Sequence, residues 1–451
     1  MTGSGKGEKE EKKNHFVILI PIFVRFTFNV KIMSELINNT EKRIAELSAF
    51  IRGIIFQREK GAELIKTYQE AIEQVQPFDV MVVVHELMKD NPQGDALFRL
   101  KKGINRSLNM LYKGLVSKEI PDYSTQPFFN VLQQENNELN ERLIALRPFI
   151  KAFNEKNADE QKIRSALREI KNRVSALQEF NLHYVKKENI LFPLIEKHLK
   201  EYGCLPMMWS YHDDIRNLMK STVETIIPDH TDLKLLNRLL GDLFFNMYTI
   251  RFREEYILFP VIFDLIPEDE LHDMLEQAFD VGFAFISPPS KKLLKKKPQK
   301  NLLREKEETL LSQEELGDRL LDFGTGKLTI QQAVMMLNHL PVDVTFVDEN
   351  DQVRYFSTPG DRIFPRSKAI IGRLVENCHP PSSVHVVKEL VDAFRTGKKQ
   401  KESFWIQMGG RFILIQYFAL HDDAGRFRGT LEVSQDVTDI RKLKGEKRLM
   451  E

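Results

Sequence analysis

The sequence predicts a mainly helical protein with a C-terminal α+β domain. Up to about residue 286, apolar residues recur at spacings of three and four, which is the period of an amphipathic helix. From Leu340 onward, apolar and polar residues alternate, which is typical of strands. A chain of 451 residues is long enough for roughly two to four domains that each bury a core.

Composition excludes several classes of protein. Lys and Arg number 66 against 65 Asp and Glu, so the chain has no excess charge that would attract nucleic acid. The two cysteines, Cys204 and Cys378, lie far apart and form no CxxC motif. This excludes a disulfide scaffold and a cysteine-rich zinc module, and we expect a cytoplasmic protein.

Residues 1–33 differ from the rest of the chain. A start rich in Gly, Lys and Glu leads into the apolar stretch Phe16–Val24, which contains Pro21 and is followed by Arg25. A membrane-spanning helix needs about 20 apolar residues, so we expect no transmembrane segment here. A cleaved signal peptide is the alternative, but no small-residue cleavage site is evident. We predict a disordered or artefactual extension.

Residues 34–118 have the pattern of a small all-helical domain of unknown function. Apolar residues at helical spacing run through this region, and the Pro-containing segments Gln76–Asp79 and Asn91–Gly94 interrupt them. Its His85 has no polar cluster around it in the sequence. We expect this histidine to be hydrogen-bonded or at the surface.

Residues 119–286 predict a four-helix bundle. Amphipathic segments cover about 127–154, 159–191, from 207 onward, and 233–258, and one more helix is expected over 268–285. Short connections favour up-down connectivity. The second and fourth segments end in a repeated phrase, Lys187–Pro193 and Glu254–Pro260, and both copies finish with the sequence Ile-Leu-Phe-Pro. Because proline does not easily continue a helix, we expect both helices to end there.

Residues 287–334 form a basic linker followed by a predicted helix over Leu302–Leu321. A lysine run of this kind is usually solvated, and binding to nucleic acid or membrane is the less favoured alternative. We therefore expect no nucleic-acid partner.

Residues 335–440 predict an antiparallel sheet with helices on one face. A hairpin is expected from Val342–Val347 and Gln352–Phe356, followed by a helical middle. Three further strands are predicted over Glu402–Met408, Phe412–His421 and Gly429–Val437. Together they give five strands, and a charged helical tail is expected over 441–451.

The bundle contains candidate metal ligands. A metal between facing helices needs inward histidines and carboxylates, with partners on one helix three or four residues apart. His183 has Lys187 at this spacing, whereas Glu188 lies about 140° around an ideal helix from the histidine. Glu188 therefore reaches the centre only after a helix adjustment. The candidate ligands are His183, Glu188, His212 and Glu254.

Three segments resemble the hemerythrin-like (HHE cation-binding) family. They are His183–Pro193, Met208–Arg216 and Arg253–Pro260. The resemblance covers about residues 120–265. It implies a four-helix bundle with a non-haem di-iron centre, used for oxygen, nitric oxide or iron sensing and storage.

The chain departs from this family pattern at three positions. Gln126 stands where the branch places a histidine, Lys187 replaces a carboxylate, and Ile250 replaces a histidine. A buried lysine would also repel a cation. Three alternatives therefore stay open: a di-iron centre, a single weakly held metal, and loss of metal binding, with His183 and His212 as hydrogen-bonded core residues.

The C-terminal residues 335–440 resemble a PAS domain. The resemblance rests on the segments Asp343–Asp348, Ile371–Arg373, Asn377–Pro381 and Gly429–Thr438. It implies a cavity for a small ligand of unknown identity, or a dimerisation module. His379 could hold haem, although a lone histidine is more often structural.

No catalytic set stands out. Asp322–Gly324 matches a kinase triplet without the other kinase motifs, and Gly324–Leu328 is too short for a phosphate-binding loop. We therefore predict a non-enzymatic cytoplasmic sensor that signals through an unknown protein partner or through a PAS homodimer. The alternatives are an iron-handling or nitric-oxide-repair protein, or a scaffold with a decayed metal site.

Overall fold

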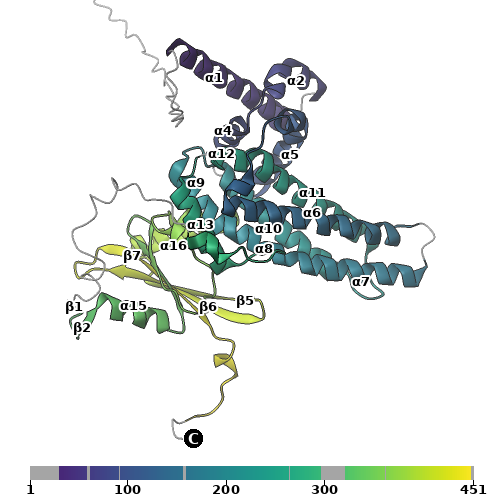
Figure 1. Ribbon diagram of the computed structural model, residues 1–451. Coiled ribbons are helices and arrows are strands. Elements are labelled where there is room, and N and C mark those ends of the chain that lie inside the picture. The colour runs from purple at the N-terminus through teal and green to yellow at the C-terminus, as the bar shows by residue number, and fades with distance from the viewer. Residues whose placement is uncertain are drawn as a thin grey trace, which may run out of the picture. The chain divides into compact units, whose positions relative to one another are not determined.

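The structure is a computed structural model. It describes residues 30–57, 61–90, 92–155, 159–263, 265–295, 320–360 and 362–447. The predicted extension up to residue 29, and the linker and helix over 296–319, lie outside the described residues. The chain divides into two units, residues 1–42 and residues 43–451. Figure 1 shows the described helices and strands.

Helices α1 to α5 make up the N-terminal helical region. Their bounds are α1 Val30–Arg52, a π-turn Gly53–Gln57, α2 Gly61–Thr67, α3 Gln69–Glu73, α4 Pro77–Met88 and α5 Gly94–Val116. The helix α1 therefore includes residues 30–33, which the sequence assigned to the extension. Helix α4 starts at Pro77 because proline tolerates the first turn, where its missing N–H is not needed. Gln76 and Asp79 form a capping box there.

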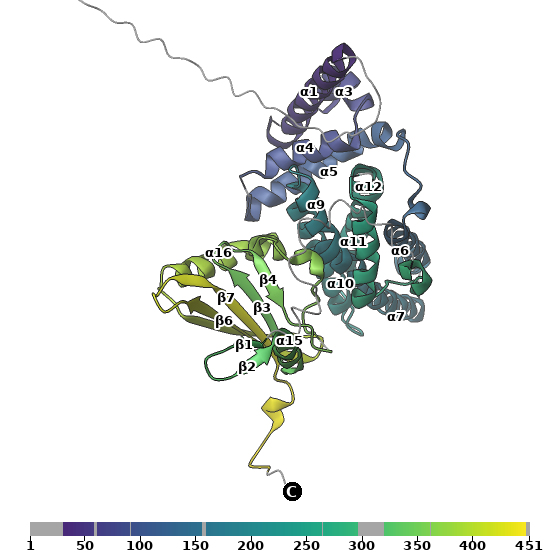
Figure 2. The same ribbon diagram turned by 60° about the vertical axis from the view of Figure 1, so that its left-hand side comes forward.

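Four long helices form the predicted bundle. They are α6 Pro127–Phe153, α7 Glu160–Ala176, α10 Cys204–Thr225 and α11 Leu233–Arg253. Both views show them side by side (Figures 1 and 2). Asp159 and Asp232 cap α7 and α11, because each carboxylate accepts hydrogen bonds from backbone N–H groups of the first turn.

Both copies of the repeated phrase begin with a π-turn. After α7, a 3-10 turn Leu177–Phe180 leads to α8 Asn181–Lys186, the first π-turn Lys187–Leu191 and α9 Phe192–His198. After α11, the second π-turn Glu254–Leu258 leads to α12 Phe259–Phe263. The prediction that these helices end at the prolines is wrong. Each proline stands in the first turn after the wider π-turn, where its missing N–H is tolerated.

The N-terminal helices and the bundle share one core. Helix α13 Glu268–Val281 packs on α6 and α8, and the buried apolar residues from Leu47 to Ala284 form one continuous cluster. The boundary expected at residue 118 therefore does not separate two cores. Among the described residues, no helix is long and apolar enough to cross a membrane.

The C-terminal domain confirms the predicted five-stranded antiparallel sheet. Its strands are β3 Asp343–Asp348, β4 Val353–Phe356, β5 Lys401–Met408, β6 Arg411–His421 and β7 Phe427–Asp436. The order is β4-β3-β7-β6-β5. Helix α16 Pro381–Arg395 packs on β6 and β7, and two 3-10 turns, Lys368–Ile370 and Val375–Cys378, complete the helical middle.

Two predicted helices of this region are different in the structure. Leu320–Asp322 is strand β1, which pairs with β2 Lys327–Thr329 before α15 Ile330–His339. Gly324 permits the tight turn between these strands because it adopts a φ of 83°. The described part of the C-terminal tail has only the 3-10 turn Ile440–Lys442. Gly445, with a φ of 66°, does not favour a continuing helix.

We expect Gly429→Ala to destabilise the C-terminal sheet by about 3 kcal/mol or more. Gly429 has a φ of 137°, and an added Cβ would overlap the carbonyl oxygen of Val347 on the paired strand. Gly410→Ala is the matched control, because Gly410 also has a positive φ but faces open space, so its cost is about 1 kcal/mol. Urea unfolding with hydrogen exchange of the β7 amides measures both. Equal costs would contradict this account.

Candidate functional site

The centre of the bundle is a buried cluster of charged and polar side chains. They come from α6, α8, α10 and the two π-turns, and each is at most 4% exposed. The cluster consists of Glu135, Asn136, His183, Lys186, Lys187, Glu188, His212 and Glu254. Groups of this kind are rarely buried unless they are paired, so their contacts determine what the site can do.

The structure brings all four predicted ligand residues into this cluster, as two pairs. His183 Nε2 lies 3.0 Å from Glu254 Oε2, and His212 Nδ1 lies 2.8 Å from Glu188 Oε1. Lys187 connects the pairs, because its ammonium group donates to Glu254 Oε1 and lies 3.0 Å from His212 Nε2. The lysine thus occupies the position between carboxylate and imidazole that a cation would take.

The contact with Lys187 fixes the tautomer of His212. An ammonium group has only donors, so Nε2 of the ring must accept, and Nδ1 carries the proton that it donates to Glu188. Burial lowers the pKa of His212 well below its usual value, and the positive charges of Lys187 and Arg216 lower it further. His212 is therefore a neutral ring.

Glu188 faces the centre because it lies in the first π-turn. An ideal helix would turn Glu188 away from His183, but the wider turn brings the Glu188 side chain inward. Lys187 and Glu188 are therefore both buried although they are adjacent in the sequence. Arg216 holds the carboxylate with two hydrogen bonds of 2.9 Å. Burial raises the pKa of Glu188 to about 7, although Arg216 opposes this shift.

Glu254 accepts from three buried donors. Besides His183 and Lys187, Asn136 Nδ2 donates to it over 3.0 Å. Burial alone would raise the pKa of Glu254, but Lys187 and His183 outweigh burial and lower it to about 2. Glu254 is therefore an ionised carboxylate whose oxygens already have protein partners.

Sequence reasoning missed three members of the cluster, Glu135, Asn136 and Lys186. Glu135 Oε2 lies 2.8 Å from His183 Nδ1, and Glu135 accepts from Lys186 over 2.8 Å and from the backbone N–H of Ala284 over 2.7 Å. A signal was present, because Glu135 lies between Leu132 and Leu139 on the apolar face of α6. A carboxylate at such a position needs a buried partner.

Comparison with known families matches the two regions. The hemerythrin HHE cation binding domain matches residues 127–262, and a PAS domain matches residues 334–438. This chain is a hemerythrin-like protein with a C-terminal PAS domain. A search of curated proteins finds no match.

Two solved structures are similar to parts of the chain. A C-terminal domain from Streptococcus mutans is 35% identical, with a TM-score of 0.28, and the match covers 28% of this chain and 99% of that one. The PAS domain of a protein from Colwellia psychrerythraea is 16% identical, with a TM-score of 0.21, and the match covers 24% of this chain and 97% of that one.

The hemerythrin-like core does not fit a di-iron centre as it is arranged. Three carboxylates, Glu135, Glu188 and Glu254, face three basic side chains, Lys186, Lys187 and Arg216, so the protein's own cations already balance the charge. A divalent cation would add uncompensated charge to a fully buried site. The described residues contain no group of three or more His, Cys, Asp or Glu side chains arranged to hold a metal.

The PAS domain contains a cavity of about 530 Å³, within the usual range for small-ligand sites. Its walls are mostly apolar and include Ile415, while Arg366, Thr430 and His379 add polar groups. Arg366 Nε and Thr430 Oγ1 are buried without a hydrogen-bond partner. Burial and the nearby arginines lower the pKa of His379 to about 4, so this histidine is neutral at pH 7.

The first π-turn also contacts the PAS domain. Val185 and Asn189 line the PAS cavity, and Arg373 Nη1 donates to the carbonyl oxygen of Glu188 over 3.1 Å. The Arg373 guanidinium is also paired with Glu196 at 2.6 and 2.8 Å. The backbone that carries Lys187 and Glu188 is therefore held from the PAS side.

We expect Lys187→Met and Glu254→Gln each to cost about 3–5 kcal/mol of unfolding free energy, because each leaves a buried charge without its partner. The double variant should cost less than the sum, with a coupling of about 2 kcal/mol or more. Chemical denaturation of the four proteins measures this.

The matched control is the exposed pair Lys220 and Glu224 on α10, whose charged atoms lie 3.9 Å apart. The same two types of substitution there should couple by less than about 0.5 kcal/mol. A core coupling as small as that of this surface pair would show that Lys187 does not stabilise the charge of Glu254.

Proposed function

We propose that this protein is a non-enzymatic cytoplasmic sensor in which a ligand in the PAS cavity acts on the hemerythrin-like bundle. One observation carries the proposal: Val185 and Asn189 of the bundle form part of the cavity wall, on either side of Lys187 and Glu188. A ligand in the cavity would touch the segment that places these two side chains in the core. The bundle then passes the signal to a protein partner.

The cavity predicts the chemistry of its ligand. An apolar space favours an apolar body, and the unpaired Arg366 Nε and Thr430 Oγ1 favour a hydrogen-bond acceptor at one end. The Arg366 guanidinium lies 3.7 Å from the Glu432 carboxylate, which is a long ion pair. A ligand carboxylate could replace Glu432 as its partner. A medium-chain carboxylate has both features, and decanoate is a suitable probe.

Arg373 is the coupling residue in this proposal. It holds the Glu188 carbonyl oxygen with one nitrogen and Glu196 with two others, so it fixes the π-turn against α9. Holding a long side chain in one conformation costs entropy. The three hydrogen bonds of the Arg373 guanidinium offset this cost together. A shift of the PAS segment around Arg373 would therefore reach Glu188 directly.

We expect decanoate to slow amide hydrogen exchange over residues 187–191 of the wild-type protein, because the ligand completes the cavity wall next to this turn. Arg373→Met should keep decanoate binding but lose most of this protection. Exchange followed by mass spectrometry, with calorimetry for binding, measures both effects.

Arg395→Met is the control for this experiment. Arg395 pairs with Asp351 and Asp392 within the PAS domain and should leave the protection unchanged. Ile415→Trp, which fills the cavity, should abolish binding and protection together. Protection in Arg373→Met equal to that of wild type would contradict the coupling.

A homodimer through the PAS domain is part of the proposal. Helix α15 and the β1–β2 hairpin carry apolar side chains that are largely exposed, and α15 buries none of its residues. The exposed side chains are Leu320, Phe323, Val334, Met335 and Met336. Exposed apolar side chains gathered on neighbouring elements are typical of a protein interface, and a second copy of the domain would cover them.

Iron handling is the second candidate function, because the match to the cation-binding family favours it. We expect wild-type protein purified without oxygen to hold well below one iron per chain, since Lys187 occupies the cation position. Lys187→Glu should gain about one divalent metal per chain, because it replaces the ammonium with a carboxylate beside His183, His212 and Glu254. Elemental analysis and the visible spectrum measure this.

Lys187→Met separates the two effects of that substitution, because it removes the ammonium without adding a ligand, and it should gain no metal. About two irons per wild-type chain, with an oxo-bridged charge-transfer band, would establish the di-iron alternative instead. A haem spectrum that disappears in His379→Ala would make haem, in place of a carboxylate, the ligand of the PAS cavity.

A further inference from the structure

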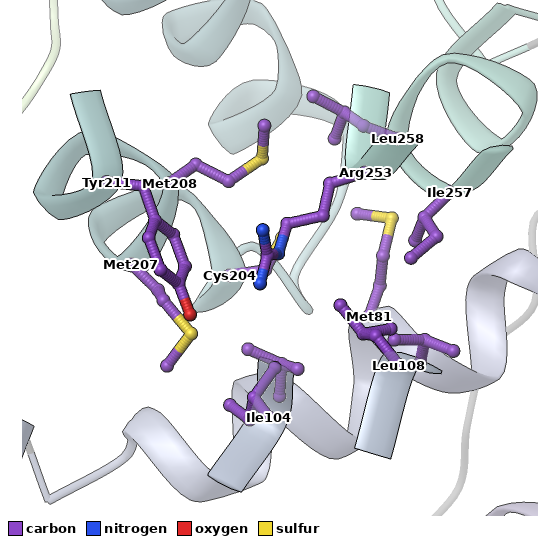
Figure 3. A pocket seen from close by; sticks show the side chains of 12 residues that line it. Met81, Ile104, Leu108, Cys204, Met207, Met208, Tyr211, Arg253, Ile257 and Leu258 are labelled. Carbon is purple, nitrogen blue, oxygen red and sulfur yellow. The ribbon is translucent and has the colours of Figure 1, made fainter. Parts of the chain in front are cut away.

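A second buried charge lies away from the ionic cluster, at a small cavity between α4 and α5 on one side and α10 and the second π-turn on the other. The cavity measures about 40 Å³. Its lining is almost wholly aliphatic and sulfur-containing, and Arg253 extends into the middle of the lining side chains (Figure 3). Its lining includes Val84, Ile104, Cys204, Met207, Tyr211 and Arg253.

Arg253 lacks the partner that a buried guanidinium requires. Arg253 is only 6% exposed, and its Nη1 has no hydrogen-bond partner. Nη2 donates to the side-chain oxygen of Asn105, and the guanidinium carbon lies 4.2 Å from the centre of the Tyr211 ring. A neutral amide and a ring face do not neutralise the charge.

The carboxylates nearest in sequence are engaged elsewhere. Glu254 pairs with Lys187 in the ionic cluster, and Glu255 pairs with Arg251 over 2.7 Å. Another cation lies near the cavity, because Lys101 Nζ is 4.6 Å from the centre of the same Tyr211 ring and is paired with Asp214. Arg253 is in no ion pair with any carboxylate of the described ranges, so the cavity has an excess of positive charge.

The cavity restricts what can supply the missing negative charge. A buried water needs about 10–15 Å³, so 40 Å³ offers room for about three waters or a small ion. The polarisable sulfurs of Cys204 and Met207 and the side chain of Ile104 cannot replace a hydration shell by hydrogen bonding. A weakly hydrated ion loses least on entering such a site, whereas sulfate is too large and too strongly hydrated.

We propose that this cavity binds a small, weakly hydrated monovalent anion, such as nitrite or bromide, on Nη1 of Arg253. The anion would pair with a charge that is otherwise buried without a counter-ion, so its binding stabilises the folded protein. The site lies apart from the PAS cavity, and the inference does not depend on the proposed sensor function.

The test follows thermal unfolding of the full-length protein in sodium nitrite and, separately, sodium bromide, with sodium gluconate keeping the ionic strength constant. We expect Tm to rise and saturate, by roughly 5 °C when the site is full. Sodium sulfate at the same ionic strength should give no saturable rise. A nitrite response that is linear and never saturates would be a general salt effect and would overturn the proposal.

Matched variants assign the response to the cavity. Arg253→Met should lose the saturable rise, while Arg106→Met, which changes an exposed arginine on α5, should keep it. If Arg253→Met does not fold, Val84→Leu decides, because it adds a methylene to the cavity wall without changing any charge. A full nitrite response in Val84→Leu, or in a folded Arg253→Met, would contradict the site.

Discussion

The rest of the structure depends on the ammonium group of Lys187, which lies between Glu254 and His212 in the centre of the bundle. Buried carboxylates are tolerated only when opposite charge and hydrogen bonds compensate their lost hydration. Lys187 provides both for Glu254 and also orients His212 toward Glu188. Through this contact, the first π-turn, α10 and the second π-turn are tied to one point, and Asn136 adds α6 because it donates to Glu254.

The two π-turns make this arrangement possible. In a regular helix adjacent residues lie about 100° apart, so Lys187 and Glu188 could not both face one centre. The wider turn allows both to do so and also accommodates the proline that follows. The same turn recurs at Glu254 in the second copy of the phrase. The duplicated phrase therefore determines a duplicated distortion as well as a duplicated helix.

Each copy of the phrase also borders a different cavity. The first π-turn lies beside the PAS cavity, with Asn189 in its wall, and Arg373 holds the turn from the PAS side. The second borders the small cavity of Arg253, with Ile257 and Leu258 in its lining. Asn189 in the first cavity wall lies one residue from Glu188, and Ile257 in the second lies three residues from Glu254. A ligand in either cavity would therefore lie close along the chain to a member of the same ionic cluster.

The sequence alone determined the fold class, the two family resemblances and the four polar residues His183, Glu188, His212 and Glu254 as members of one centre, because helical spacing and the repeat are local properties. Only the tertiary structure decided what these residues contact. Glu135, Asn136 and Lys186 join the cluster from positions that the repeat does not mark, and Glu188 reaches it because a π-turn rotates it inward. Such contacts depend on helix distortion and on packing between segments far apart in the chain, which local spacing does not encode.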